Sequence, residues 1–533
     1  MKFTASTSLL LLTILATTFA VAQCNQPGKF CHIIIVIQEN RTPDDVFGAD
    51  LTFENGVDLA GGGYGIYVQN GQTYHEYIQN TPRDLNGCPP PGTLGPCVDP
   101  DHGQGGWVTD YDSGNMDGFC HEYAASGQCP SYSYIPQTSV QPYFDIATNY
   151  GFANYFFQTN EGPSFEAHQF LFSGTSTGVS PGQQYSQYFV SQNPGKDKYG
   201  NVGCPYTGSS FPVWVYTDES NAGALLQSEC YPHDTLVTNS SGDKGVSWGY
   251  YTPSLPAIWN APEALSEVCV VQPNGSCGGP EWTHVHVADE GLYSDAPIFD
   301  DLKNCNLPAI SWVIPDKRYS DHAGEDNTGL GPSFVGDIVD AVGGGMSGST
   351  CNPPSTNNAL YWKQQPTAIF IVWDDWGGWF DHVQPWAVYK QESSQKTICT
   401  VAPNDWGCGY VSGFRVPLLV VSPYTQAHYV SGALPSPGMD LKHTHDFGSI
   451  LAFTEQNFNL PFIDGPPRRR LRRLQCARLG PATKQRPLSD FFGSTAYNFT
   501  SINTSEPYTC FQNFGSCTGT TYVPGGPDSG DGD

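Results

Sequence analysis

Polar side chains that could bind a metal ion directly follow the apolar run His32–Gln38. Glu39, Asn40 and Arg41 come next in the chain. A carboxylate and an amide oxygen suit a divalent cation, and a guanidinium suits an oxyanion such as phosphate. The alternative is that Asn40 only caps the start of a helix, since Asn is a favoured cap residue. These residues therefore indicate either a site for a metal and an oxyanion, or a helix end.

Asp374 and Asp375 follow another apolar run and lie in the segment WDDWGGWFDHV. Two adjacent carboxylates repel each other unless a cation or an arginine compensates. A divalent metal ion is the simplest partner. The alternative is a solvated acidic turn, but the flanking tryptophans favour burial. The segment therefore favours a second group of metal ligands.

Ser164 lies in the stretch NEGPSFEAHQFLFSGTS, directly after the turn Gly162-Pro163. We expect it at the N-cap position of a helix over Phe165–Phe172, with His168 on the same face as the apolar residues. Unpaired N–H groups at a helix start bind phosphate, and a nearby metal could activate the hydroxyl as a nucleophile. An ordinary serine cap is the alternative reading.

Several histidines are candidates for phosphate binding or proton transfer. His102 and His322 stand beside aspartates in glycine-rich, loop-like segments, which favours a site over a surface position. His284 and His286 would share one face of a strand, where they could pair on a metal. A lone histidine is more often structural. The expected substrate or phosphate ligands are Arg41, His286 and His382.

The elements that must position these groups form an α/β pattern. Four apolar, β-rich runs are typical of buried parallel strands, and helical patterns lie between them. We expect one mostly parallel central sheet with helices on both faces, and polar groups converging at the carboxyl ends of its strands. The predicted strands are His32–Gln38, Leu307–Pro315, Ala368–Trp373 and Val416–Ser422. The predicted helices are Pro142–Tyr150, Phe165–Phe172, Ala296–Asn304, Ser333–Val342 and Ser449–Phe458.

Composition excludes several classes of protein. The chain has 533 residues, 13% of them aromatic and only 14% charged, with a formal net charge of −28. So many aromatic residues could bury a core, which argues against a coiled coil or a disordered acidic chain. Strong net acidity argues against a nucleic-acid binder.

The first 22 residues predict a signal peptide, with Lys2, an apolar stretch and an A-x-A site before Gln23. We expect a secreted protein, or a periplasmic one in a Gram-negative host, without a transmembrane span. The 17 cysteines lack CxxC spacing, so disulfides are the simplest account. We expect one large domain over 23–523, with disulfide-stapled, loop-rich insertions at about 50–140 and 176–280. The tail 524–533 is expected to be disordered.

The segment 466–487 differs from the rest of the chain, because it holds seven Arg, one Lys, Cys476 and no acidic residue. It is compatible with a basic patch for an anionic membrane or polymer, with an exposed loop, or with an error in the reading frame or gene model. Without it the cysteine count would be even.

Taken together, the segments resemble the bacterial phosphoesterase family that includes non-haemolytic phospholipases C and secreted acid phosphatases, with an alkaline-phosphatase-like core. Matching segments run in family order from residue 32 to about 460, among them IIIVIQENRTPDDVFG, DPDHGQGGW, NEGPSFEAHQFLFSGTS and IFIVWDDWGGWFDHV. Many phospholipase-like members have Thr where Ser164 stands, and many carry a His where this chain has Phe447.

The resemblance implies one divalent metal ion on Glu39, Asn40, Asp374 and Asp375, and Ser164 as the nucleophile. His102 and His322 resemble its phosphate-binding or acid–base histidines. It implies a secreted phosphoesterase that hydrolyses phosphate monoesters, as acid phosphatases do. The alternatives are a phospholipase C acting on phospholipid headgroups and, from another class, a non-catalytic extracellular binding protein. The metal, the natural substrate and the oligomeric state remain open.

Overall fold

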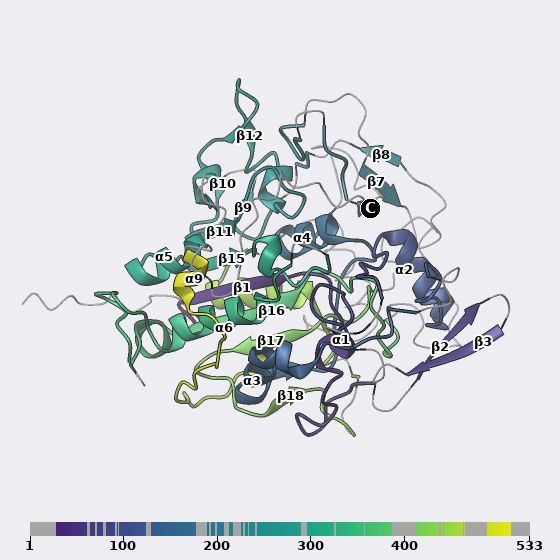
Figure 1. Ribbon diagram of the computed structural model, residues 1–533. Coiled ribbons are helices and arrows are strands. Elements are labelled where there is room, and N and C mark those ends of the chain that lie inside the picture. Colours follow the sequence, from purple (N-terminus) through teal and green to yellow (C-terminus); the bar gives the residue numbers. More distant parts are fainter. Residues whose placement is uncertain are drawn as a thin grey trace, which may run out of the picture.

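The structure is a computed structural model (Figure 1). It describes residues 28–512 and 517, except 61–63, 70–71, 78–81, 91–92, 94, 124–128, 177–188, 191–192, 198–199, 207–212, 217–224, 228–229, 233, 240–241, 289–295, 325–326, 356–357, 386–411, 436–438, 441, 462 and 464–487. The predicted signal peptide, the basic segment 466–487 and the tail 524–533 lie outside the described residues. No helix in the described part is long and apolar enough to cross a bilayer.

The core is an eight-stranded sheet in the order β14-β11-β15-β1-β16-β17-β4-β18. β17 is antiparallel to both of its neighbours, whereas the other neighbouring strands run parallel to each other. The mostly parallel α/β sheet is therefore confirmed. The strands are β14 Val285–Val287, β11 Trp248–Thr252, β15 Ile310–Val313, β1 His32–Gln38, β16 Thr367–Trp373, β17 Leu418–Val421, β4 Gly151–Ala153 and β18 Tyr429–Ser431.

All four predicted strands form, but the prediction that Val416–Ser422 runs parallel is wrong. Its central part, β17, pairs antiparallel with β16, with Ile369 opposite Val421. The run is apolar because β17 is buried on both faces, and a central strand is buried in this way whichever direction it takes. As a result, the amino end of β17 meets the carboxyl ends of β1 and β16.

Helices cover both faces of the sheet, as the packing of two adjacent residues of β11 shows. The ring of Tyr250 packs against Phe172 of α4, while the hydroxyl of Tyr251 donates to Asp301 of α5. Successive side chains of a strand point to opposite faces, so α4 and α5 lie on opposite sides. The five predicted helices are confirmed as α3 Gln141–Asn149, α4 Ser164–Ser173, α5 Pro297–Asn304, α6 Gly331–Gly343 and α7 Phe447–Phe458.

Short elements complete the described chain. The remaining helices are α1 Pro43–Phe47, α2 Gln104–Tyr111 and α9 Tyr508–Gln512, and the single-turn elements are η2 Asp112–Gly114, η3 Gln137–Ser139, η4 Ala261–Ala264, η5 Glu281–His284, η6 Lys317–Tyr319, η7 Leu360–Gln364 and η8 Leu488–Phe491. The small sheets are made of β2 Tyr64–Gln69, β3 Gln72–Tyr77, β5 Phe156–Phe157, β19 His445–Asp446, β6 Phe189–Val190, β7 Val213–Tyr216, β8 Leu225–Gln227, β9 Thr238–Asn239, β10 Gly242–Asp243, β12 Val270–Val271 and β13 Cys277–Gly278.

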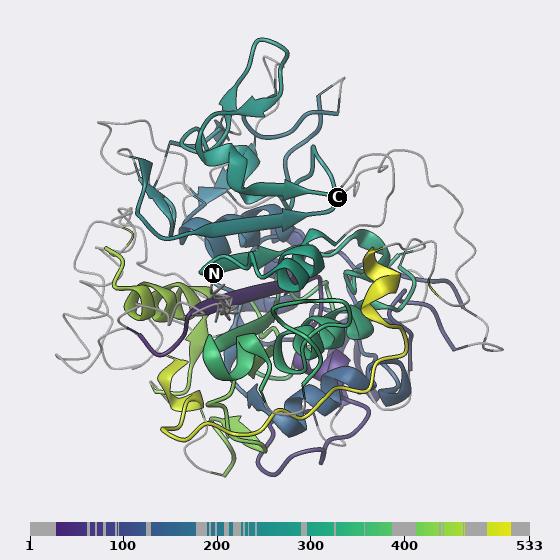
Figure 2. The same ribbon diagram turned by 90° about the vertical axis from the view of Figure 1, so that its left-hand side faces the viewer.

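Disulfides staple the regions expected to be loop-rich, and the part of the chain that carries β9, β10 and β12 stands above the sheet (Figures 1 and 2). The expectation that the cysteines form disulfides is confirmed for the described residues; Cys399 and Cys408 lie outside them. The disulfides resolved are Cys88–Cys97, Cys120–Cys129, Cys204–Cys230, Cys269–Cys277, Cys305–Cys351 and Cys510–Cys517.

Candidate active site

The carboxyl ends of β1 and β16 bring the two predicted ligand groups together. The strands are parallel neighbours with Gln38 opposite Trp373, so Glu39 and Asp374 leave the sheet side by side. The backbone N–H of Asn40 donates to Asp374 Oδ1 at 3.0 Å. Thr42, not Asn40, caps α1, because its Oγ1 accepts from the Asp45 N–H. The helix-cap alternative for Asn40 is therefore ruled out.

Asp374 and Asp375 are both fully buried, so they do not form a solvated turn. Asp374 Oδ1 accepts from the Asp375 N–H at 2.7 Å, and Asp375 Oδ1 accepts from the Gly377 N–H at 2.8 Å. Gly377 has a φ of +64°, and a Cβ there would lie 2.2 Å from the carbonyl oxygen of Asn40. The glycine thus allows the loop after β16 to pack on the loop after β1.

The two carboxylates have opposite titration behaviour. Burial raises the pKa of Asp375, and the charge of Asp374 raises it further. Burial also disfavours the ionised form of Asp374, but the contact with His168 and the Asn40 N–H hold its pKa below the usual value. Asp374 is therefore the carboxylate that stays charged, and Asp375 is the more basic partner.

Ser164 points into this cluster. Its Oγ donates to Asp375 Oδ2 at 3.2 Å, and the residue is 4% exposed. The predicted N-cap position is wrong: Pro163 is the N-cap, Ser164 is the first helical residue, and no side-chain cap hydrogen bond forms. The rigid proline turn places the hydroxyl at the start of α4, facing the acidic pair instead of its own helix.

His102 and His322 lie beside the same strand end. Asn40 Nδ2 donates to His102 Nε2 at 3.0 Å, and His102 Nδ1 donates to the carbonyl oxygen of Pro100 at 2.7 Å. The ring centroids of His102 and His322 are 5.6 Å apart. His322 Nδ1 lies 2.5 Å from the Ala323 carbonyl oxygen and 3.8 Å from Asp99 Oδ2. The structure thus brings both predicted histidines together next to Asn40.

His168 belongs to the cluster although the sequence reasoning assigned it to the apolar helix face. Its Nε2 lies 3.4 Å from Asp374 Oδ2, without hydrogen-bond geometry, and its ring is fully buried. The spacing to Ser164 could have revealed it, because residues four apart share a helix face. His168 therefore places a buried imidazole directly behind Asp374.

The predicted metal ligands include buried oxygen atoms that lack a hydrogen-bond donor, as expected of a metal site. Asn40 Oδ1 and Asp374 Oδ2 are buried and accept no hydrogen bond from the described residues. Burying an oxygen atom without a hydrogen-bond donor costs free energy, and burying two neighbouring carboxylates costs more because their charges repel. Asn40 also has a φ of +63°, which turns it at the strand end. Glu39 follows the same strand and is 4% exposed. This donor set suits a divalent cation.

Arg41 lies in a different setting from the one expected of a phosphate ligand. Its Nη1 donates to Asp45 Oδ2 at 3.0 Å, and its Nε donates to the Asp321 carbonyl oxygen at 3.0 Å. Its Nη2 donates to carbonyl oxygens of Asp321 and Leu85, and the guanidinium lies over Trp379. These contacts tie Arg41 to its own loops, so the structure gives it a role in holding the strand ends.

His382 also has internal partners. Its Nδ1 lies 2.7 Å from Asp44 Oδ2 and its Nε2 lies 3.0 Å from Asp58 Oδ1. Arg415 pairs with Asp381 and with Asp44 in the same network. Burial would lower the pKa of His382, but the charge of Asp44 and the two hydrogen bonds raise it to about 10. His382 is thus a cation within a buried ion network.

Asp44, Asp381 and His382 also lie close enough to share a metal ion. Arg415 already supplies a cation there, which makes an ion-pair network the simpler account.

Sequence reasoning missed Arg415 because it assumed a parallel β17. In that direction Arg415 would enter the sheet at the opposite edge.

His286 lies away from this cluster. It is in the edge strand β14, three strands from β1, and its ring stacks on Tyr251 with centroids 4.8 Å apart. Burial lowers its pKa. No contact among the described residues connects it to Ser164, so the structure gives no support to His286 as a phosphate ligand.

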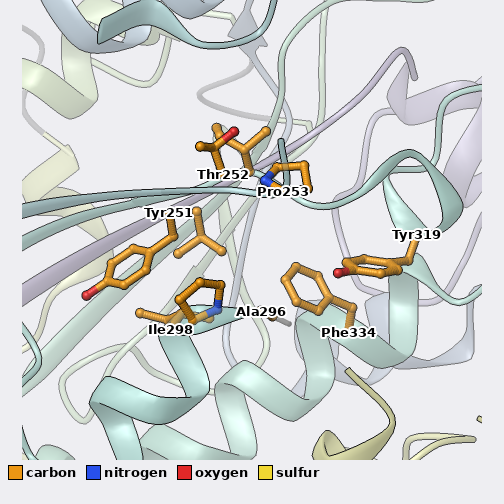
Figure 3. A pocket seen from close by; sticks show the side chains of 10 residues that line it. Tyr251, Thr252, Pro253, Ala296, Ile298, Tyr319 and Phe334 are labelled. Carbon is orange, nitrogen blue, oxygen red and sulfur yellow. The ribbon is translucent and has the colours of Figure 1, made fainter. Parts of the chain in front are cut away.

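Two cavities differ in their relation to the cluster. Figure 3 shows one of about 10 Å³ between β11, α5 and α6, lined by side chains such as Tyr251, Ile298 and Phe334. It is about the size of one water and holds none of the predicted site residues.

The other cavity has a volume of about 260 Å³ and adjoins the site. It is lined by Pro100, whose carbonyl binds His102, and by Gly378 of the loop after Asp375. Asp101, Asp110 and Glu122 also line it, which makes it acidic. Burial raises the pKa of Asp110 well above its usual value.

Comparison with known proteins agrees with this geometry. Residues 30–461 match the phosphoesterase family. The chain is 24% identical to a non-hemolytic phospholipase C of Burkholderia pseudomallei over 89% of its own length, and it spans 60% of that relative. It is also 24% identical to phospholipase C B of Mycobacterium tuberculosis, over 81% of this chain and 73% of the relative. The chain therefore belongs to the phosphoesterase family.

Proposed function

We propose that this chain is a metal-dependent phosphoesterase that uses Ser164 as its nucleophile and cleaves phosphodiester headgroups of phospholipids. The observation that carries the proposal is the Ser164 hydroxyl, which donates to Asp375 at the end of β16. A hydroxyl held by a buried carboxylate, next to further metal-type oxygens, is the arrangement that nucleophilic catalysis needs.

In the first step, Ser164 Oγ forms a bond to phosphorus while the bond from phosphorus to the leaving alcohol oxygen breaks. The hydroxyl proton passes along its existing hydrogen bond to Asp375 Oδ2. Water then attacks phosphorus and gives a proton to the group that protonated the leaving alcohol, while the bond from phosphorus to Ser164 Oγ breaks and Asp375 returns its proton to the serine. Ser164 is the first residue of α4, and the positive end of the helix dipole favours an anionic phosphate there.

The leaving oxygen takes a proton, for which we propose His322. Its Nδ1 contacts the Ala323 carbonyl oxygen, and Asp99 Oδ2 lies 3.8 Å from the same nitrogen. His102 is held at both ring nitrogens, by Pro100 and Asn40, so we assign it a positioning role.

Glu39, Asn40, Asp374 and Asp375 would hold the divalent metal, which when bound supplies positive charge that lowers the pKa of the serine hydroxyl and stabilises the phosphate oxygens. The unsatisfied oxygens of Asn40 and Asp374 support this assignment. We expect chelation to abolish turnover and a restored divalent ion to recover it.

Two observations favour a phosphodiester over a monoester. The relatives reported above are phospholipases C by name. The cavity beside the site is lined by the carboxylates of Asp101 and Glu122, which attract a cationic headgroup and repel a second phosphate charge. Hydrolysis of monoesters in the manner of acid phosphatases remains the second candidate, because Ser164 stands where many phospholipase-like members have Thr.

We also propose that the protein is secreted. The predicted signal peptide supports this, as do the six disulfides of the described chain, since disulfides persist in oxidising compartments.

The test compares p-nitrophenyl phosphorylcholine with p-nitrophenyl phosphate, using chelator-stripped and metal-restored protein. We expect metal-dependent turnover that is faster on the diester. Ser164→Ala should remove it, while Ser173→Ala, a buried serine at the other end of α4, should retain it. Faster turnover of the monoester would favour the second candidate. No turnover of either substrate by metal-loaded protein would overturn the proposal.

A further inference from the structure

Three side chains of the kinds that bind metals meet near β10, and Figure 1 shows β10 above the central sheet. Asp243 comes from β10, and Glu281 and His284 come from η5. One donor atom from each residue lies within 4.8 Å of the other two. We call these residues the insertion triad, and we propose that it binds a divalent metal ion of the zinc type.

The fold explains why residues so far apart in sequence meet here. β10 leads into β11, and η5 leads into β14. These two strands are parallel neighbours, with Tyr250 opposite Val285. The segments that precede them therefore lie side by side at the amino ends of the strands.

This position separates the insertion triad from the active site. The catalytic residues follow the carboxyl ends of β1 and β16. β11, β15 and β1 are parallel, so their amino ends lie at the opposite edge of the sheet. The insertion triad is thus a second location for a metal ion, with its own ligands.

The triad side chains are held in place before any ion binds. Asp243 Oδ1 accepts from the Gly245 N–H at 2.7 Å. The ring of His284 lies against buried Trp248, with centroids 4.7 Å apart. Preorganised ligands of this kind lose less conformational entropy when they bind an ion.

Within the described residues, the two carboxylates of the triad have no basic neighbour in contact other than His284. Glu281 Oε2 is buried and accepts no hydrogen bond from the described residues. In that part of the chain, no Lys or Arg forms an ion pair with Asp243 or Glu281. Two carboxylates this close repel each other and favour a cation between them.

The ligand types select the class of metal. An imidazole with two carboxylates suits Zn²⁺, and water can complete the coordination because Asp243 is exposed. Ca²⁺ prefers an all-oxygen set, so we expect it to bind more weakly. The bound ion would cross-link β10 to η5.

The test titrates Zn²⁺ alone into full-length, chelator-stripped protein and counts bound equivalents by calorimetry and elemental analysis. We expect His284→Ala to lose one equivalent, or to bind it at least roughly 100-fold more weakly, while phosphoesterase turnover persists. Asp374→Asn should keep this equivalent, because it alters only the catalytic site. His443→Ala removes another histidine paired with an aspartate and should change nothing.

Hydrogen exchange gives a second readout that does not depend on activity. Zn²⁺ should slow exchange over residues 242–248 and 281–287 in the wild-type chain, and not in His284→Ala. Glu281→Gln, which keeps the side-chain shape, replaces His284→Ala if that variant fails to fold. Equal Zn²⁺ binding by wild type and folded triad variants would overturn the proposal, as would loss of the equivalent only in Asp374→Asn.

Discussion

Replacing His382 by Gln tests whether a buried cation holds the loops around the active site together. Both ring nitrogens of His382 contact carboxylates, Asp44 at 2.7 Å and Asp58 at 3.0 Å. A neutral imidazole has only one N–H, so two such hydrogen bonds require the protonated ring. We therefore expect His382→Gln to destabilise the protein most where the ring of the wild type is charged.

The magnitude follows from the pKa of His382. Its rise from 6.5 to about 10, at about 1.4 kcal/mol per pH unit, corresponds to roughly 5 kcal/mol. The side chain is 29% exposed, and Arg415 still pairs with Asp44 in the variant, so a loss of about 3 kcal/mol is the realistic expectation. Because the folded pKa is raised, this stability is fully present below pH 6.5 and disappears as the pH rises through about 10.

The assay is urea unfolding followed by tryptophan fluorescence, with the disulfides intact, at pH 6 and at pH 10. We expect the free energy of unfolding of the variant to be about 3 kcal/mol below that of the wild type at pH 6, and the two values to be almost equal at pH 10. The control is His443→Gln, which removes a single pair with the partly exposed Asp440 and should cost about 1 kcal/mol or less. A gap for His382→Gln that is the same at both pH values would refute a charged His382.

Two further variants probe burial and backbone. Burial raises the pKa of Glu263 to about 8, so the folded protein keeps a proton that the unfolded chain loses, and stability falls as the pH rises from 4.5 to about 8. Glu263→Gln should not show this pH-dependent loss of stability, so the melting temperature of the variant should rise relative to that of the wild type between pH 5 and pH 8. If the melting temperatures of the two proteins change with pH by the same amount, Glu263 is not protonated in the folded state. Gly377→Ala places a Cβ 2.2 Å from the Asn40 carbonyl oxygen and should lower turnover by roughly 100-fold. Gly200→Ala shares the positive φ but meets nothing within 4 Å, so it should keep full turnover; equal activity of the two variants would show that the contact does not position Asn40.

The sequence predicted the elements of the core because their signal is local. Long apolar runs such as Ala368–Trp373 are compatible with little besides a buried strand, and the strand ends then locate Glu39 and Asp374 at one edge. Direction is different, since an apolar run carries no information about which way its strand runs. The antiparallel β17, and with it the position of Arg415, therefore could not be derived from composition.

Side-chain roles depend on packing that sequence spacing does not encode. Arg41 follows the ligand pair in sequence, yet its guanidinium turns to Asp45 and to backbone carbonyls. His382 was expected to bind substrate or phosphate, but Asp44 and Asp58 from distant loops contact both of its ring nitrogens. His168, in contrast, could have been assigned to the site from its spacing to Ser164.

The most direct measurement of the central claim is mass spectrometry of protein quenched in acid during turnover of a phosphorylcholine ester. We predict a phosphorylcholine adduct on the peptide that contains Ser164, and no adduct in Ser164→Ala, whose turnover should fall by at least about 10³-fold. A bare phosphoryl adduct formed from a monoester would retain Ser164 as the nucleophile and change the substrate. An unmodified Ser164 peptide together with wild-type turnover by Ser164→Ala would contradict the account.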